Sequence, residues 1–190
     1  MLARIINETT DAVVAAVQGV DDILDAVTGT VKDQVINVIQ TGGDVGGSTI
    51  EAVASVADGA VKGAGKVGAS VTDTAFNTMS GVVKGVSQIG GNVIEAIRGG
   101  AEGVVKATAE TGGDVGGAAV KAVEGSIKAA GDVGADTSEA AKAAVGGALS
   151  AATSVGGDTA STVRNALLSA ASLPRDVIEA AVKGSDDEKK

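Results

Sequence analysis

The stretch that decides the fold runs from residue 63 to residue 106 and reads GAGKVGASVTDTAFNTMSGVVK followed by GVSQIGGNVIEAIRGGAEGVVK. Both halves have 22 residues and end in Gly-Val-Val-Lys, so Lys84 and Lys106 occupy the same position in successive units. The same spacing reaches back to Lys62 and forward to Lys128. A fixed period of this length is typical of repeat architectures, in which one unit corresponds to one structural element or pair of elements.

With these lysines closing each unit, residues 19–172 divide into seven 22-residue repeats without an insertion. We interpret residues 1–18 as an N-terminal amphipathic helix with a degenerate repeat. Residues 173–183 then form a partial repeat after Pro174, and residues 184–190 form a charged tail.

A second period of 11 residues lies inside the first and predicts helix. Acid-to-base pairs at i,i+4 recur at multiples of 11, as in Asp58–Lys62 and Glu102–Lys106, and this orientation supports a helix. Eleven residues in three turns is about 3.67 residues per turn, close to an α-helix. The sequence shows no sustained alternation of apolar and polar residues with a period of two, the pattern that would indicate β-strands. The sequence therefore predicts an all-α protein of long amphipathic helices built from 2 × 11-residue repeats.

Wound as one helix, each unit has a wide apolar face of small side chains and a narrower polar face of alternating sign. The apolar face is marked by one column of the repeat: Val45, Val67, Ile89, Val133 and Val155. The polar face is marked by the charged residues opposite it: Glu51, Lys62, Lys84, Glu95, Lys106 and Lys128.

The chain has 29 glycines, and their arrangement admits two interpretations. The recurring pairs such as Gly90–Gly91 and Gly112–Gly113 are either hinges between shorter helices or close-contact points in continuous ones. We favour long helices, bent at some pairs. A further column at the edge of the polar face is predicted to mediate helix packing: Gly59, Gly81, Gly103 and Gly125.

Composition excludes several functions. The chain has neither His nor Cys, so it lacks the usual nucleophile–base pairs and transition-metal ligands. The string Gly63-Ala-Gly65-Lys-Val-Gly68 matches a dinucleotide fingerprint, but it lies inside a helical repeat with no preceding strand. We therefore expect no enzymatic activity, no catalytic residue, no cofactor and no metal. A net charge of −9 argues against nucleic acid as a partner.

No signal peptide and no bilayer-spanning apolar run is visible in the sequence. The expected location is cytoplasmic or peripheral to a membrane.

The segments Gly81-Val-Val-Lys-Gly-Val86 and Glu102-Gly-Val-Val-Lys106 resemble the core of the 11-residue repeats of synucleins. The doubled 22-residue unit is similar to that of exchangeable apolipoproteins. The likeness covers residues 19 to about 183 in period and residue type. The lysine-rich synuclein pattern and the punctuating prolines of apolipoproteins are absent. The resemblance implies reversible binding to lipid surfaces.

The sequence thus predicts a non-enzymatic structural protein that self-assembles, as a homo-oligomer, into a coat or scaffold on a lipid or other apolar surface. One alternative is a stand-alone helical filament or tube. Another is a soluble stress protectant of the late-embryogenesis type.

Overall fold

The computed structural model describes residues 2–17, 23–41 and 49–187, and all regular structure within them is helical. The all-α prediction is confirmed. The helices are α1 (Leu2–Val17), α2 (Ile23–Thr41), α3 (Thr49–Lys66), α4 (Val71–Gln88), α5 (Val93–Glu110), α6 (Val115–Asp132), α7 (Thr137–Val155), α8 (Gly157–Ser169) and α9 (Arg175–Asp187).

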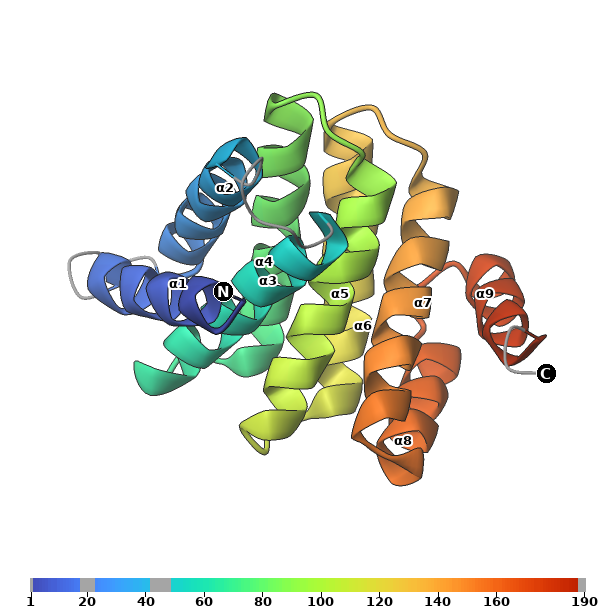
Figure 1. Cartoon of the computed structure of the whole chain (residues 1–190). Coiled ribbons are helices and arrows are strands. Elements are labelled where there is room, and N and C mark those ends of the chain that lie inside the picture. The colour runs from blue at the N-terminus through green and yellow to red at the C-terminus, as the bar shows by residue number, and fades with distance from the viewer. Residues whose placement is uncertain (1, 18–22, 42–48, 188–190) are drawn as a thin grey trace.

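The helices form two layers that advance together along the chain (Figure 1). With the exception of α6, each of the helices α1 to α7 packs more extensively on the second helix after it than on the next one, so α1, α3, α5, α7 and α9 form one layer and α2, α4, α6 and α8 the other. From α3 onward, consecutive helices reverse direction at short turns, and neighbours within one layer run parallel (Figure 1). The colour gradient of Figure 1 crosses the molecule from α1 to α9 because the helices are stacked in sequence order.

The expectation of long helices running through the recurring Gly–Gly pairs is wrong at Gly90–Gly91 and Gly112–Gly113, where the chain turns, while Gly46–Gly47 lies outside the described residues. Gly90 has a φ of +70°, and Gly68, Gly112 and Gly134 have φ between +71° and +76°, a left-handed conformation that glycine adopts without a Cβ penalty. After α4, the N–H of Gly91 donates to the carbonyl of Val86 (2.9 Å), and the N–H of Gly90 donates to that of Ser87 (3.1 Å). This pair of bonds is the Schellman motif, which ends a helix.

The residue after each turn starts the next helix. Asn92 accepts a hydrogen bond from the N–H of Glu95 (3.1 Å), and Asp114 accepts one from the N–H of Gly117 (3.0 Å). Ser70 and Asp136 cap α4 and α7 in the same way. An N-cap satisfies backbone donors that have no partner inside the helix. Helices α4 to α7 consequently begin at residues 71, 93, 115 and 137.

The core is made of small side chains. Buried apolar residues lie along both layers and are mostly Ala and Val, with Met79, Ile97 and Leu167 among the largest fully buried side chains. Near the C-terminus, α8 ends at Ser169 and α9 begins directly after Pro174. Helix α9 continues to Asp187 and so enters the segment that the sequence leaves as a charged tail.

Candidate interaction surface

The spacing of helices within a layer depends on glycines that face the backbone of a neighbouring helix. A Cβ built on Gly59 in α3 would lie 2.5 Å from the carbonyl oxygen of Ile6 in α1. On Gly81 it would lie 2.7 Å from that of Thr28, and on Gly125 2.5 Å from that of Phe76. Separations under 3.0 Å are essentially never seen for a real Cβ, so a side chain at these positions would push the helices apart.

Two more glycines extend this set of contacts. Gly103 in α5 faces the carbonyl oxygen of Ala54 in α3, and Gly147 in α7 faces that of Arg98 in α5. In these later helices the partner lies 49 residues before the glycine, whereas Gly59 and Gly81 contact residues 53 positions earlier. The four-residue difference is about one helical turn. Helices α1 and α2 are therefore displaced by about one turn relative to the rest of the stack.

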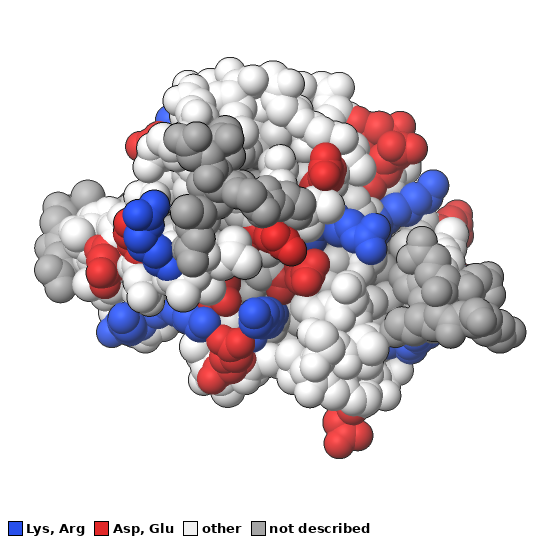
Figure 2. Space-filling view, viewed as in Figure 1, with Lys and Arg blue, Asp and Glu red and all other residues white. Residues whose placement is uncertain are grey.

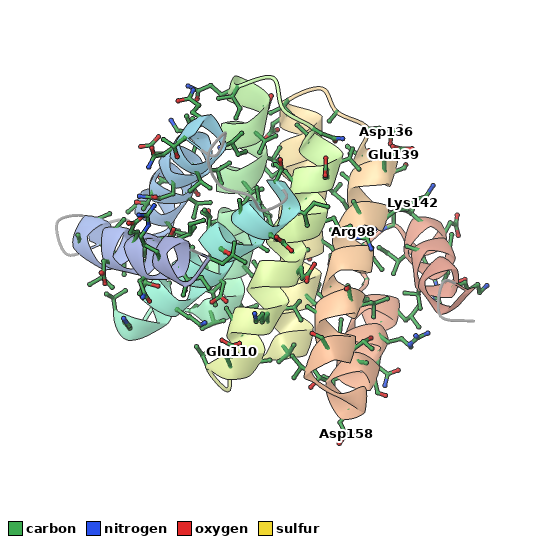
Figure 3. All side chains as sticks on the ribbon, viewed as in Figure 1. Arg98, Glu110, Asp136, Glu139, Lys142 and Asp158 are labelled. Carbon is green, nitrogen blue, oxygen red and sulfur yellow. The ribbon has the colours of Figure 1, made fainter. Side chains whose placement is uncertain are left out.

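Successive helices of one layer begin 44 residues apart, so residues with this spacing occupy equivalent positions of their helices. Glu95 in α5 thus corresponds to Glu139 in α7, and Arg98 corresponds to Lys142. We call these four residues the paired charge rows: each helix contributes a carboxylate and, three residues later, a cation. Arg98, Glu139 and Lys142 are labelled in Figure 3, and they come from these two neighbouring helices.

A shallow groove of about 500 Å³ lies beside the paired charge rows. Its lining includes the apolar side chains of Ile94 and Ala143 together with all four charged residues. Within the described residues, neither Arg98 nor Lys142 comes within salt-bridge distance of a carboxylate. Acidic and basic side chains are interspersed on this face rather than gathered into patches of one sign (Figure 2).

Helix α3, which belongs to the same layer as α5 and α7, carries a buried carboxylate. The Asp58 side chain is 3% exposed, and its Oδ1 lies 2.6 Å from Nζ of Lys62. Lys62 also reaches Glu110 of α5, with Nζ 2.6 Å from Oε2, and so ties α3 to α5. Burial raises the pKa of Asp58, even though the nearby Lys62 lowers it. Burial by itself would lower the pKa of Lys62, but its bonds to the two carboxylates outweigh this and raise it.

A half-buried charge pair lies on the other layer. Lys121 Nζ lies 2.7 Å from Glu124 Oε2, and the Ser172 hydroxyl donates to the other oxygen of Glu124. Burial favours the neutral form of Glu124, but the two hydrogen bonds outweigh it and lower the pKa of this carboxyl. The contact joins α6 to the segment before α9.

A hollow of about 290 Å³ lies between α8 and α9. Its apolar lining includes Leu167, Leu168, Leu173 and Ile178, and Arg175 and Glu179 also line it. Leu168 is one of three large apolar side chains that are exposed among the described residues, together with Leu2 and Val155.

In the structure, the residues that the sequence assigns to an apolar and a polar face do not separate into a buried set and an exposed set. Val67, Ile89 and Val133 are half-buried at the ends of helices, Val155 is exposed, and Val45 lies outside the described residues. Among the charged residues, Glu51, Lys84, Lys106 and Lys128 are exposed, whereas Lys62 and Glu95 are half-buried. The helices bury more than one side, because each contacts its own layer and the opposite layer.

Within the described residues, no group of three acidic side chains is arranged to hold a metal ion. None of the described helices has both the length and the apolarity that crossing a bilayer requires.

Comparison with known proteins supports the fold class alone. No protein-family model and no curated protein matches the sequence. The crystal structure of the de novo designed helical repeat protein DHR7 is similar, with a TM-score of 0.53 and 18% sequence identity. The match covers 100% of this chain and 99% of that one. The chain therefore has a helical-repeat fold.

The paired charge rows were missed in the sequence because the 22-residue phase compares helices of different layers. The signal that could have found them is the 44-residue spacing, which repeats Glu95 at Glu139 and Arg98 at Lys142. That spacing acquires a meaning only when alternate helices are known to lie side by side.

Proposed function

We propose that the chain is a non-enzymatic structural protein: a stack of 22-residue helical repeats that serves as a scaffold and associates with further copies of itself. In this proposal each unit is one helix with its turn. The packing face of each unit, made of Gly, Ala and Val, contacts mainly other helices of the same chain.

The observation that carries the proposal is the contact of helical glycines with neighbouring backbone. Gly59, Gly81 and Gly125 each face a carbonyl oxygen of the second helix before them. Such contacts let backbones approach closely, and packed helices of this kind are stiff because little space remains for rearrangement. A stiff stack that carries its charges at fixed heights suits a scaffold.

The absence of His and Cys from the sequence supports a non-enzymatic role, because the commonest general bases and thiol nucleophiles are lacking. The buried Asp58 is paired with Lys62 within α3, and the half-buried Glu124 is paired with Lys121 within α6.

The ends of the stack favour side-by-side association over end-to-end growth. The exposed stripe of α1 includes Arg4, Glu8 and Asp11, and that of α9 includes Arg175 and Asp176. Polar outer faces on terminal repeats are the usual device that stops a helical stack from extending. A filament made by end stacking is therefore disfavoured.

A coat on a lipid or other apolar surface is the second candidate. It requires the helices to separate at the glycine turns, because the Val and Ala side chains that would contact lipid are buried between helices. The observation that favours it is the small size of these side chains. Each gives less stabilisation on burial than Leu or Phe, so opening costs less than in an ordinary core.

Sedimentation velocity and circular dichroism with and without zwitterionic vesicles test the proposal. The scaffold predicts full helicity in dilute, lipid-free protein and concentration-dependent association without vesicles. Helicity or assembly that arises only with vesicles would favour the lipid coat. A chain without helix in dilute solution would favour the stress protectant. A fully helical monomer at all concentrations would contradict self-association.

A further inference from the structure

We propose that α9 is a strap that opens from α7 as a unit, and that two copies of the chain associate by exchanging it, the α9 of each copy docking on the α7 of the other. The inference rests on the proposed self-association and identifies the element and the symmetry that carry it.

Helix α9 is held mainly from one side and lies at the outer edge of its layer, beyond α7 (Figure 1). Helix α5 packs on α3, α4, α6 and α7, whereas α9 packs mainly on α7 and makes fewer contacts with α8. The apolar residues of α9 form one stripe: Ile178 and Val182 are buried, and Val177 and Ala181 are half-buried beside them. An amphipathic helix that lays one such stripe on a neighbour can make the same contacts from another chain.

The glycine contacts that hold the inner helices together do not extend to α9. Gly147 of α7 meets the backbone of Arg98 in α5, but a Cβ on Gly184, the glycine of α9, would meet no atom within 4 Å. Opening α9 therefore separates side chains and leaves the close backbone contacts of the stack intact. An element with so few neighbours opens at a lower free energy than the core of the fold.

The hinge of the strap is the segment 170–174, which joins α8 to α9. It contains no glycine and so lacks the left-handed turn found at Gly90 and Gly112. Five residues reach about 17 Å when extended. Pro174 disfavours the helical conformation at Leu173, so the hinge keeps α8 and α9 as two separate helices.

A second copy is the partner that this surface fits, because it carries the same apolar stripe that α7 already accepts. In a reciprocal exchange the contacts between α7 and α9 are formed again across two chains, and the conformation of the hinge is what changes. The resulting pair has a two-fold axis and is closed. It therefore gives association without end-to-end growth of the stack.

The test uses introduced thiols, since the chain has no Cys of its own. Leu168→Cys places a thiol on α8 and Glu179→Cys places one on α9, at two side chains that line the same hollow. The two single variants, one of them isotopically labelled, are mixed at high concentration and treated with a short bismaleimide. Mass spectrometry then measures the yield of cross-linked heterodimer.

Two controls accompany this mixture. Leu168→Cys mixed with Lys84→Cys, an exposed position of α4, reports random collisions. The double variant Leu168→Cys with Glu179→Cys, treated when dilute, establishes that the cross-linker spans the hollow within one closed chain.

We expect the mixture of Leu168→Cys and Glu179→Cys to give roughly tenfold or more cross-linked heterodimer than the control pair, because exchange holds the two thiols in one complex. Deleting Ala170 and Ala171 should lower the dimer dissociation constant in sedimentation velocity, since a shortened hinge strains the closed chain. In the wild type, the amides of α9 should exchange with solvent roughly tenfold or more faster than those of α5.

A wild type that self-associates while the heterodimer yield equals that of the control pair would overturn the exchange and leave the proposed scaffold intact. Amides of α9 that are protected as strongly as those of α5 would overturn the strap. A wild-type chain that is monomeric at all concentrations would instead refute the scaffold itself, and the exchange with it.

Discussion

Lys62 holds its ammonium nitrogen 2.6 Å from a carboxylate oxygen of Asp58, a side chain that is 3% exposed. The other three lysines of the same repeat column are exposed. One position of the repeat is thus used to neutralise a buried charge and to link α3 to Glu110 of α5.

This relationship predicts that the two partners respond unequally to substitution. Lys62→Gln leaves Asp58 buried without its cation and should lower the free energy of unfolding by about 3 kcal/mol. Asp58→Asn removes the buried charge while Lys62 keeps Glu110, and replacing a buried charge is often neutral, so it should change stability by less than about 1 kcal/mol. Urea denaturation at neutral pH measures both. Lys84→Gln and Lys128→Gln are the controls, at under about 0.5 kcal/mol each. Equal effects of all three lysine substitutions would contradict the assignment.

The pKa shifts of Asp58 and Glu124 predict opposite responses to pH. Burial raises the pKa of Asp58 above its ordinary 3.8, so between these values the folded chain binds more protons than the unfolded chain. The contribution of Asp58 to stability therefore falls as pH rises through this window. The pKa of Glu124 lies below its ordinary 4.5, because its bonds with Lys121 and Ser172 outweigh burial. Its contribution is present above 4.5 and is lost as pH falls through the folded-state pKa.

The measurement compares unfolding free energies of the wild type with those of Asp58→Asn and Glu124→Gln across the acidic range. As pH rises, the wild type should lose stability relative to Asp58→Asn and gain stability relative to Glu124→Gln. Differences that change in the same direction for both variants would show that one of these environments is wrongly assigned.

The turns make a separate prediction. Gly112 has a φ of +71°, and no atom lies near the position of its missing Cβ, so Gly112→Ala is penalised by backbone conformation alone. We expect a loss of about 1–2 kcal/mol in thermal or chemical unfolding. Asp114→Ala removes the N-cap of α6 and should cost about 1 kcal/mol. If neither variant lowered the free energy of unfolding, the continuous helix expected from the sequence would again be the better interpretation.

How far the sequence predicts the structure depends on which residues are considered. The helical class follows from the 11- and 22-residue periods and from the i,i+4 charge pairs. The interpretation of Gly–Gly pairs such as Gly90–Gly91 as hinges would also place the ends of the helices. Choosing between hinge and contact point was not possible from glycine alone, because glycine favours both left-handed turns and close approach. The neighbouring Asn92, Asp114 and Asp136 are N-caps, and this was the missed signal for the turns.

The surface was less predictable for a different reason. A helical wheel drawn for one isolated helix shows a single buried face. A helix in this two-layer fold is instead covered by neighbours in its own layer and by helices of the opposite layer. Asp58 therefore lies inside although it belongs to the polar edge of the wheel. The contact of Gly147 with the backbone of Arg98 follows from the stacking of alternate helices, which no single repeat specifies.

The glycine contacts are the central claim, and two adjacent residues of α7 test them most directly. A Cβ on Gly147 would meet the carbonyl of Arg98, whereas a Cβ on Gly146 would meet nothing within 4 Å. Both lie inside the same helix, so the gain in helix propensity on changing Gly to Ala, up to about 1 kcal/mol, is common to both. Overpacking a close contact costs about 1–3 kcal/mol and affects Gly147 alone.

The decisive measurement is the difference in unfolding free energy between Gly146→Ala and Gly147→Ala, determined by urea denaturation under identical conditions. The account predicts that Gly146→Ala is more stable than the wild type and Gly147→Ala less stable, by about 1–3 kcal/mol between the two variants. Equal stabilisation by both substitutions would contradict the claim that glycines bring the backbones of parallel helices into contact.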